Sequence, residues 1–165
     1  RGLGGAIEPG GIDQLLALNL PDAEGRPQPV TQWRGKLLLA NFWATWCGPC
    51  RKEMPEMSAW YQKQKKGSVD MVGIALDSSE NIGRFLKTTP VRYPIWRYSG
   101  NDSRAWMKSF GNSIGGLPFT VVEAPKCGYR QTLLGEVTAS VTGAKSFNGS
   151  NGAFCIKGSV HRPLL

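Results

Sequence analysis

Apolar and polar positions follow two different periods along the middle of the chain, and together they predict alternating strands and helices. Nearly continuous apolar runs at 37–44 and 69–76 are typical of strands buried on both faces of a sheet. Between them, Met54 and Met57 fall at helical spacing, which predicts a helix over 49–66. The pattern over residues 37–76 therefore predicts the order strand, helix, strand.

The strand-then-helix order continues after the second apolar run. Polar side chains at 77–79 are typical caps for a helix that reaches about residue 87. The later pattern predicts strands at 93–98, 119–123 and 129–137 and a helix at 103–110. The order predicts an α/β fold in which a mixed central sheet is flanked by helices, with parallel βαβ units followed by an antiparallel hairpin.

Both ends of the chain depart from this order. Residues 1–13 are rich in glycine and without a period, which indicates a flexible N-terminal arm. Segments 15–20 and 29–33 flank a turn-like sequence and predict an N-terminal hairpin extension. Residues 138–165 show no helical period, so the expected division is an arm, a domain over 14–137 and an atypical C-terminal segment.

Length, charge and the lengths of the apolar runs limit the functions that this chain can have. The 165 residues correspond to about one domain, and the net charge of +8 forms no single basic stripe along the sequence. We therefore expect no nucleic-acid partner. No apolar run approaches the roughly 18 residues of a membrane span. Because the chain starts at Arg1 rather than Met, we expect that a signal peptide or a membrane anchor preceded it.

The four cysteines include one close pair, Cys47 and Cys50, in the sequence WCGPC. A turn that enters a helix brings two such thiols within the roughly 5–6 Å Cα separation that a disulfide tolerates. Cys47 at the helix N-terminus, with Arg51 and Lys52 nearby, is the expected nucleophilic thiolate. Cys50, one turn inside the helix, is the expected resolving thiol.

Other roles for the cysteines fit the spacing less well. A zinc site needs two further ligands, but Cys127 and Cys155 stand alone and far away in the sequence, so no metal site is expected. A purely structural disulfide within WCGPC closes too short a loop to stabilise the fold appreciably. The single histidine, His161, lies in the atypical tail and is expected to be an exposed residue.

Three motifs together resemble a known superfamily. NFWATWCGPC at 41–50, Pro55 in the following helix and GLPFT at 116–120 are similar to the thioredoxin superfamily, and in detail to its TlpA/ResA-like extracytoplasmic branch. The resemblance spans about residues 14–137. It implies a thioredoxin-like fold, a redox-active Cys47–Cys50 disulfide and no further cofactor.

The resemblance also implies an acidic partner for the inner thiol. Thioredoxin has a buried Asp at the position of Asn41, and Asn cannot titrate. In the TlpA/ResA-like branch an acid after the second buried strand takes over the proton role, and Asp77 is the best match, with Glu80 second. A plain helix cap is the alternative interpretation of Asp77.

A substrate-binding surface is expected around the cysteines. By resemblance Pro118 is a cis proline that faces them, and it exposes the backbone of Leu117 to an extended substrate segment. An ordinary trans proline at a strand start is the alternative. Trp46, Gly48 and Pro49 are expected to complete this surface.

The resulting hypothesis is a thiol:disulfide oxidoreductase that reduces protein disulfides, because a Gly-Pro dipeptide between the cysteines is typical of reducing members. The resemblance implies a periplasmic or extracytoplasmic monomer, a membrane electron donor of the DsbD/CcdA type, and a role in cytochrome c maturation. A non-catalytic binding module that carries copper or a client is the alternative, although copper carriers generally space their cysteines by three. A peroxiredoxin-type peroxidase fits less well because the Thr-x-x-Cys pattern is missing.

Overall fold

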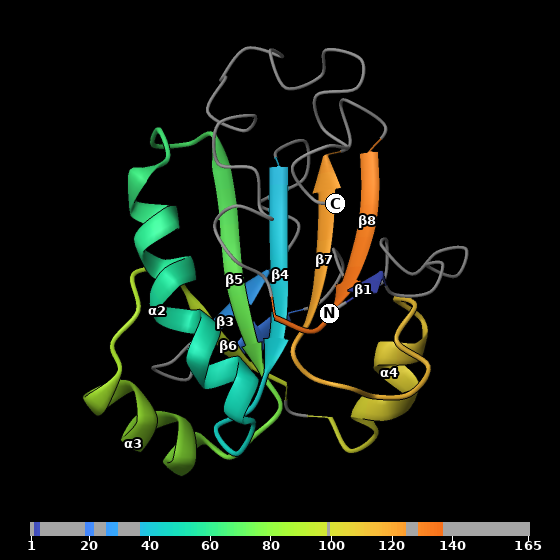
Figure 1. Cartoon of the computed structure of the whole chain (residues 1–165). Helices are drawn as coiled ribbons and strands as arrows, with labels where there is room; N and C mark the ends of the chain where they lie inside the picture. Colours follow the sequence, from blue (N-terminus) through green and yellow to red (C-terminus); the bar gives the residue numbers. More distant parts are fainter. Residues whose placement is uncertain are drawn as a thin grey trace.

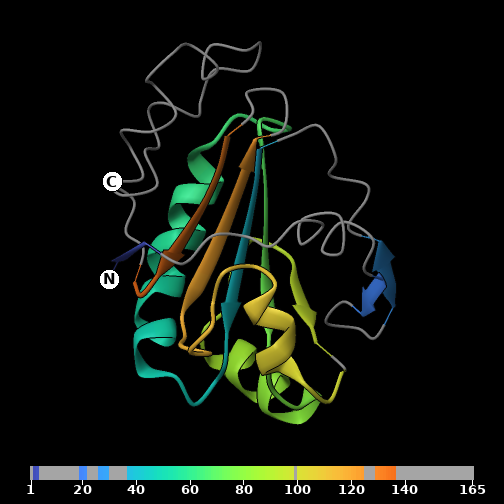
Figure 2. The same cartoon turned by 90° about the vertical axis from the view of Figure 1, so that its right-hand side faces the viewer.

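The computed structural model describes residues 2–3, 19–21, 26–29, 37–98, 100–124 and 129–136. A central sheet with helices on both sides forms most of this part of the chain, and a short hairpin lies at one edge of the molecule (Figures 1 and 2). The strands of the central sheet are β1 (Gly2–Leu3), β4 (Leu37–Trp43), β5 (Val69–Ala75), β6 (Ile95–Arg97), β7 (Phe119–Ala124) and β8 (Tyr129–Leu134). The helices are α2 (Gly48–Lys63), α3 (Ser79–Thr88) and α4 (Ser103–Lys108), and the hairpin pairs β2 (Asn19–Pro21) with β3 (Pro27–Pro29).

The sheet is mixed, as the order of elements predicts. Its strand order is β1-β8-β7-β4-β5-β6. β4, β5 and β6 run parallel, whereas β7 is antiparallel to both β4 and β8. Strand β4 therefore lies in the middle of the sheet, and the registers place Asn41 between Gly73 of β5 and Thr120 of β7. The WCGPC motif follows directly after this central strand.

The alternation of side chains along β4 divides the core into two clusters. Leu37, Leu39 and Trp43 pack on the side of α2 and α3, together with Met54, Met57 and Phe85. Leu38 and Phe42 pack on the side of α4, together with Met107 and Phe110. Each residue of β4 is at most 1% exposed, which confirms that this strand is buried on both faces.

Several boundaries differ from the sequence-based prediction. Residues 2–3, expected in a flexible arm, form β1 on β8, because main-chain pairing to a sheet edge needs no side-chain period. The hairpin forms closer to its turn than predicted, at β2 and β3. Helix α2 ends at Lys63, and the chain then turns through Gly67, whose φ of 83° favours glycine.

The remaining parts of the prediction concern residues outside the described ranges. The segment 138–165 lies there, and so do Cys127, Cys155 and His161. Within the part of the chain that the structure describes, no helix combines the length and apolar character that a membrane crossing requires. In the same ranges, no group of three or more His, Cys, Asp or Glu side chains is placed to hold a metal ion.

Candidate active site

The two cysteines of WCGPC lie where β4 passes into α2, and the structure joins them in a disulfide with a Cα–Cα distance of 5.3 Å. Cys47 is the N-cap of α2, and its backbone N–H donates to the carbonyl of Ala44 at 3.2 Å. Cys47 retains 6% exposure, whereas Cys50 has none. The outer position of Cys47 and the inner position of Cys50 are therefore as predicted.

The helix N-terminus supports a negative charge on the sulfur of Cys47. The backbone N–H of Cys50 donates to Cys47 Sγ at 3.2 Å, so the sulfur takes the place of a capping oxygen. This contact and the helix dipole both favour a thiolate there in the reduced protein. Lys52 is an exposed cation that pairs with Glu136 at 3.8 Å, and Arg51 lies 6.0 Å from the ring of Phe85. The cap therefore acts on the sulfur more directly than these two side chains do.

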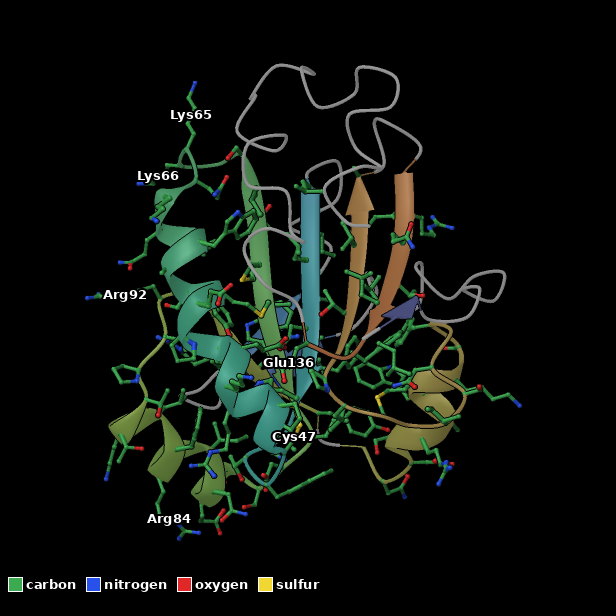
Figure 3. All side chains as sticks on the ribbon, in the orientation of Figure 1. Cys47, Lys65, Lys66, Arg84, Arg92 and Glu136 are labelled. Atoms are coloured by element: carbon green, nitrogen blue, oxygen red, sulfur yellow. A yellow bond between two sulfur atoms is a disulfide. The ribbon has the colours of Figure 1, made fainter. Side chains whose placement is uncertain are left out.

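Exposed groups surround Cys47. Trp46 is 71% exposed, and Gly48 and Pro49 are also exposed. The Leu117–Pro118 bond is cis, as predicted. Because Phe119 pairs with Phe42, Pro118 lies beside the end of β4, from which residues 44–47, the redox turn, lead into α2. Figure 3 shows Cys47 at this end of the molecule.

Ile114 is a further exposed apolar residue, with an exposure of 64%, and it belongs to the loop that leads to Pro118. Sequence analysis did not single it out, because an isolated apolar residue within a glycine-rich loop has no period to mark it. Trp46 and Ile114 are the exposed large hydrophobic residues of the described ranges, and they lie on the two loops that border the end of β4.

Asp77 lies at the end of β5 and holds the redox turn. Its Oδ2 accepts from the backbone N–H of Thr45 at 3.0 Å and from the hydroxyl of Thr45 at 2.5 Å. Its Oδ1 accepts from the backbone N–H of Ser78 at 2.7 Å and from Asn81 Nδ2 at 2.9 Å. Partial burial alone raises the pKa of Asp77, but the hydrogen bonds from Thr45, Asn81 and Ser78 outweigh it and lower the pKa. Asp77 thus connects the redox turn to the start of α3, where Ser78 is the N-cap.

Glu80 is fully exposed in the first turn of α3. Its carboxylate accepts from the Ser79 hydroxyl at 2.8 Å. This bond, followed by a backbone hydrogen bond and the charges of Arg84 and Arg97, lowers the pKa of Glu80. Its described contacts place it on the solvent side of α3.

Glu53 is a buried carboxylate that the sequence analysis missed. It lies one helical turn after Cys50 on the inner side of α2 and is 4% exposed. Asn41 Nδ2 donates to Glu53 Oε1 at 2.9 Å and to the hydroxyl of Thr120 at 3.0 Å. The signal was present in the sequence, because positions 50, 53 and 57 share the inward face of α2. Glu53 was not predicted as a site residue because only the apolar residues were used to define that face.

Tyr93 is buried near this carboxylate. Its pKa is raised, first by burial and second by the charge of Glu53. Its hydroxyl, Asn41 Oδ1 and Trp43 Nε1 are buried without a hydrogen-bond partner among the described groups. Gly73 allows this packing, because a Cβ there would lie 3.1 Å from both Trp43 Nε1 and the ring of Tyr93. Polar side chains thus gather beneath α2, on the same side of the sheet as Cys50.

Comparison with known proteins identifies the family. Residues 13–122 match the model of the AhpC/TSA family. The chain belongs to this family. Among solved structures, a thioredoxin-related protein from Neisseria meningitidis serogroup B is 64% identical; the match covers 73% of this chain and 90% of that one, with a TM-score of 0.68. StoA from Bacillus subtilis is 25% identical over 74% of this chain and 90% of its own, with a TM-score of 0.59. These matches confirm the thioredoxin-like fold.

Curated relatives of this AhpC/TSA family member are thiol-disulfide oxidoreductases. ResA from Bacillus cereus is 36% identical over 75 residues, which are 45% of this chain and 43% of ResA. ResA from Oceanobacillus iheyensis is 30% identical over 110 residues, which are 66% of this chain and 55% of ResA. The chain thus spans about half the length of the curated relatives it matches. The resemblance to the ResA-like thiol-disulfide oxidoreductases is confirmed.

Proposed function

We propose that this chain reduces protein disulfides by dithiol–disulfide exchange through Cys47 and Cys50. The observation that carries the proposal is the position of the pair: Cys47, whose sulfur caps α2, retains 6% exposure beside exposed neighbours, and Cys50, bonded to it, has none. Such a pair lets the outer sulfur meet a client while the inner one is protected from solvent.

In the proposed reaction the thiolate of Cys47 attacks one sulfur of a client disulfide, and the other client sulfur leaves as a thiolate that takes a proton. Cys50 then loses its proton and attacks the sulfur of Cys47. The second client sulfur leaves and is protonated, so the client gains two electrons and two protons. Cys47 and Cys50 are left as the disulfide seen in the structure.

We propose Glu53 as the group that accepts the proton of Cys50. General base catalysis needs a group close to the proton donor, and Glu53 is buried with Cys50 on the same face of α2, one turn away. Asp77, the acceptor predicted from the resemblance, is the competing candidate. Its four hydrogen bonds stabilise the ionised carboxylate, which disfavours proton uptake.

The wider biological setting stays a proposal based on the resemblance. We propose a periplasmic or extracytoplasmic monomer that is re-reduced by a membrane electron donor of the DsbD/CcdA type and serves cytochrome c maturation. A solved relative of 18% identity is described as a secreted disulfide oxidoreductase of Mycobacterium tuberculosis. The redox-active group in this proposal is the Cys47–Cys50 pair itself.

Two cysteine variants test the reaction. We expect Cys47→Ser to abolish reduction of a model protein disulfide, because the attacking sulfur is lost. We expect Cys50→Ala to accumulate a covalent client complex on non-reducing gels, because the mixed disulfide cannot be resolved. If both variants keep turning over the client, the mechanism is wrong.

Two further measurements test the direction and the alternative function. An equilibrium potential against glutathione of roughly −270 mV, as in thioredoxin, supports a reductant, whereas one near −120 mV reverses the direction. Titration with Cu(I), alongside the reduction assay, tests the binding-module alternative. Tight copper binding without reduction would replace the proposed activity.

A further inference from the structure

The outer side of α2 and α3 carries exposed cations from several separate segments. We define the basic face by six of them: Lys63, Lys65, Lys66, Arg84, Lys87 and Arg92. In the fully described stretch 48–92, the exposed carboxylates are Glu56 and Glu80. In Figure 3, Lys66 and Arg92 point outward on the side of α2, Lys65 lies at the upper end of this side, and Arg84 lies at its lower end. The sequence alone showed no such concentration of charge.

Tertiary packing joins these segments. The backbone N–H of Arg92 donates to the hydroxyl of Ser58 at 2.8 Å, so the segment before β6 lies against α2. Phe85 of α3 packs on Trp43 of β4, with ring centroids 5.2 Å apart, and this contact holds α3 on the same side of the sheet as α2. Segments that are far apart in the sequence therefore carry their exposed cations on the same side of the sheet.

The basic face lacks the features of an apolar interface. The exposed large hydrophobic residues of the described ranges, Trp46 and Ile114, lie on the loops beside the end of β4. A partner of the basic face is therefore bound through charge, and like-charged side chains on one face attract an extended anionic surface. Contact of this kind needs no insertion of side chains into an apolar phase.

The length of α2 separates the lysines at its far end from the client site. With 16 residues, α2 is about 24 Å long, and Cys47 caps one end while Lys63, Lys65 and Lys66 lie at the other. A typical protein interface covers about 800 Å² on each partner, which corresponds to a radius of about 16 Å. A client docked on Cys47 does not reach the lysines at the far end. The face therefore suits a second and more extended anionic surface.

We propose that the basic face docks the protein on its side against an anionic phospholipid bilayer. The exposed cations of α2 and α3 lie on the lipid headgroups, and the end that carries Cys47 stays open to clients. This inference concerns a surface outside the redox site, and it stands whether or not the chain reduces disulfides.

Flotation of the full chain with lipid vesicles tests the proposal. At 0.1 M salt we expect binding to vesicles of 30% phosphatidylglycerol in phosphatidylcholine and none to pure phosphatidylcholine. Reversing the charge at Lys66, with Lys66→Glu, is expected to weaken binding at least about fivefold, and the triple variant with Lys63→Glu and Lys65→Glu about a hundredfold or more. The matched control is Lys108→Glu on α4, beyond the opposite face of the sheet. It is expected to stay within about twofold, because charges more than about 10 Å apart are screened.

Several outcomes overturn the proposal. It is wrong if the protein does not bind the phosphatidylglycerol vesicles. It is also wrong if Lys66→Glu and Lys108→Glu weaken binding equally, because binding would then depend on the net charge of the protein and not on the basic face. If the vesicles do not bind but reduction of a Glu-rich disulfide peptide depends on Lys66, the partner is an acidic protein instead. Reduction of a small neutral disulfide is expected to be unchanged in all variants. A chain that binds vesicles but reduces no disulfide contradicts the proposed function alone.

Discussion

Two carboxylates flank the redox turn in opposite environments. Glu53 lies beneath α2, 4% exposed, with an Asn41 amide donor at 2.9 Å. Asp77 lies at the end of β5, half-buried, with donors from Thr45, Ser78 and Asn81. Several donors stabilise a fixed charge, whereas proton transfer needs a group whose charge can change beside the thiol. We therefore propose a positioning role for Asp77 and proton transfer for Glu53.

The largest expected effect separates these two roles. Glu53→Gln keeps the shape of the side chain and an acceptor for Asn41 but removes the base. We expect resolution of the mixed disulfide at pH 7 to slow by about 10²-fold or more. Stopped-flow measurement of client release from the Cys47 adduct gives the rate.

Three controls surround this measurement. Glu56→Gln changes an exposed carboxylate on the same helix and is expected to leave the rate within about twofold. Asp77→Asn and Glu80→Gln are expected to change resolution only a few fold. If Asp77→Asn slows resolution as strongly as Glu53→Gln does, the proposed difference between the two carboxylates is wrong, and Asp77 also takes part in proton transfer from Cys50.

Substitution of Gly73 tests how tightly the buried side chains beneath α2 are packed. A Cβ at this position would lie 2.8 Å from Ile95 Cδ1 and 3.1 Å from Trp43 Nε1. We expect Gly73→Ala to lower the free energy of unfolding by about 1–3 kcal/mol, measured by urea denaturation. In the matched control, Gly83→Ala in α3, the new Cβ meets nothing within 4 Å beyond its own stretch of helix, and the variant is expected to be neutral or stabilising. Equal effects at both sites would contradict the packing argument.

Substitution of Thr45 tests the hydrogen bonds of the half-buried Asp77. Thr45→Val removes the hydroxyl that donates to Asp77, and we expect a loss of about 1–2 kcal/mol in the free energy of unfolding. Thr45→Ser keeps the hydroxyl and is expected to retain most of the stability. Loss of equal size in Thr45→Ser would show that the methyl group, and not the hydrogen bond, is responsible.

The lowered pKa of Asp77 also predicts a pH dependence. Because the folded state favours the ionised carboxylate, its stabilisation is present above the ordinary carboxyl pKa of about 4 and disappears as the pH falls through the lowered pKa. The stability difference between the wild type and Asp77→Asn is therefore expected to be full at pH 7 and to shrink below about pH 4. Thermal unfolding across this range measures it, and a constant difference would contradict the role of the charge.

Tyr93→Phe gives the smallest expected effect. The hydroxyl of Tyr93 is buried without a partner among the described groups, so its removal is expected to change the free energy of unfolding by less than about 1 kcal/mol. Urea denaturation checks this value. A larger loss would show that the hydroxyl of Tyr93 is hydrogen-bonded in solution.

Most of the fold followed from local patterns. Apolar runs such as the one at 37–44 located the central strands within one residue, because a strand buried on both faces leaves no place for polar side chains. Short elements were less accurate: β6 spans Ile95–Arg97 rather than 93–98, since the pairing with β5 and not the local sequence sets its ends. The strand at Gly2–Leu3 was missed for the same reason.

What the sequence determined by itself is the disulfide pair and its asymmetry, because two residues between the cysteines and a helix after them fix which sulfur is outermost. What only the tertiary structure decided is the environment of each charged group. Glu53 meets Asn41 from 12 residues away, Asp77 meets Thr45 from 32 residues away, and the cations of the basic face converge from separate elements. Burial and electrostatic neighbours depend on distance in space, which the order of residues along a chain does not specify.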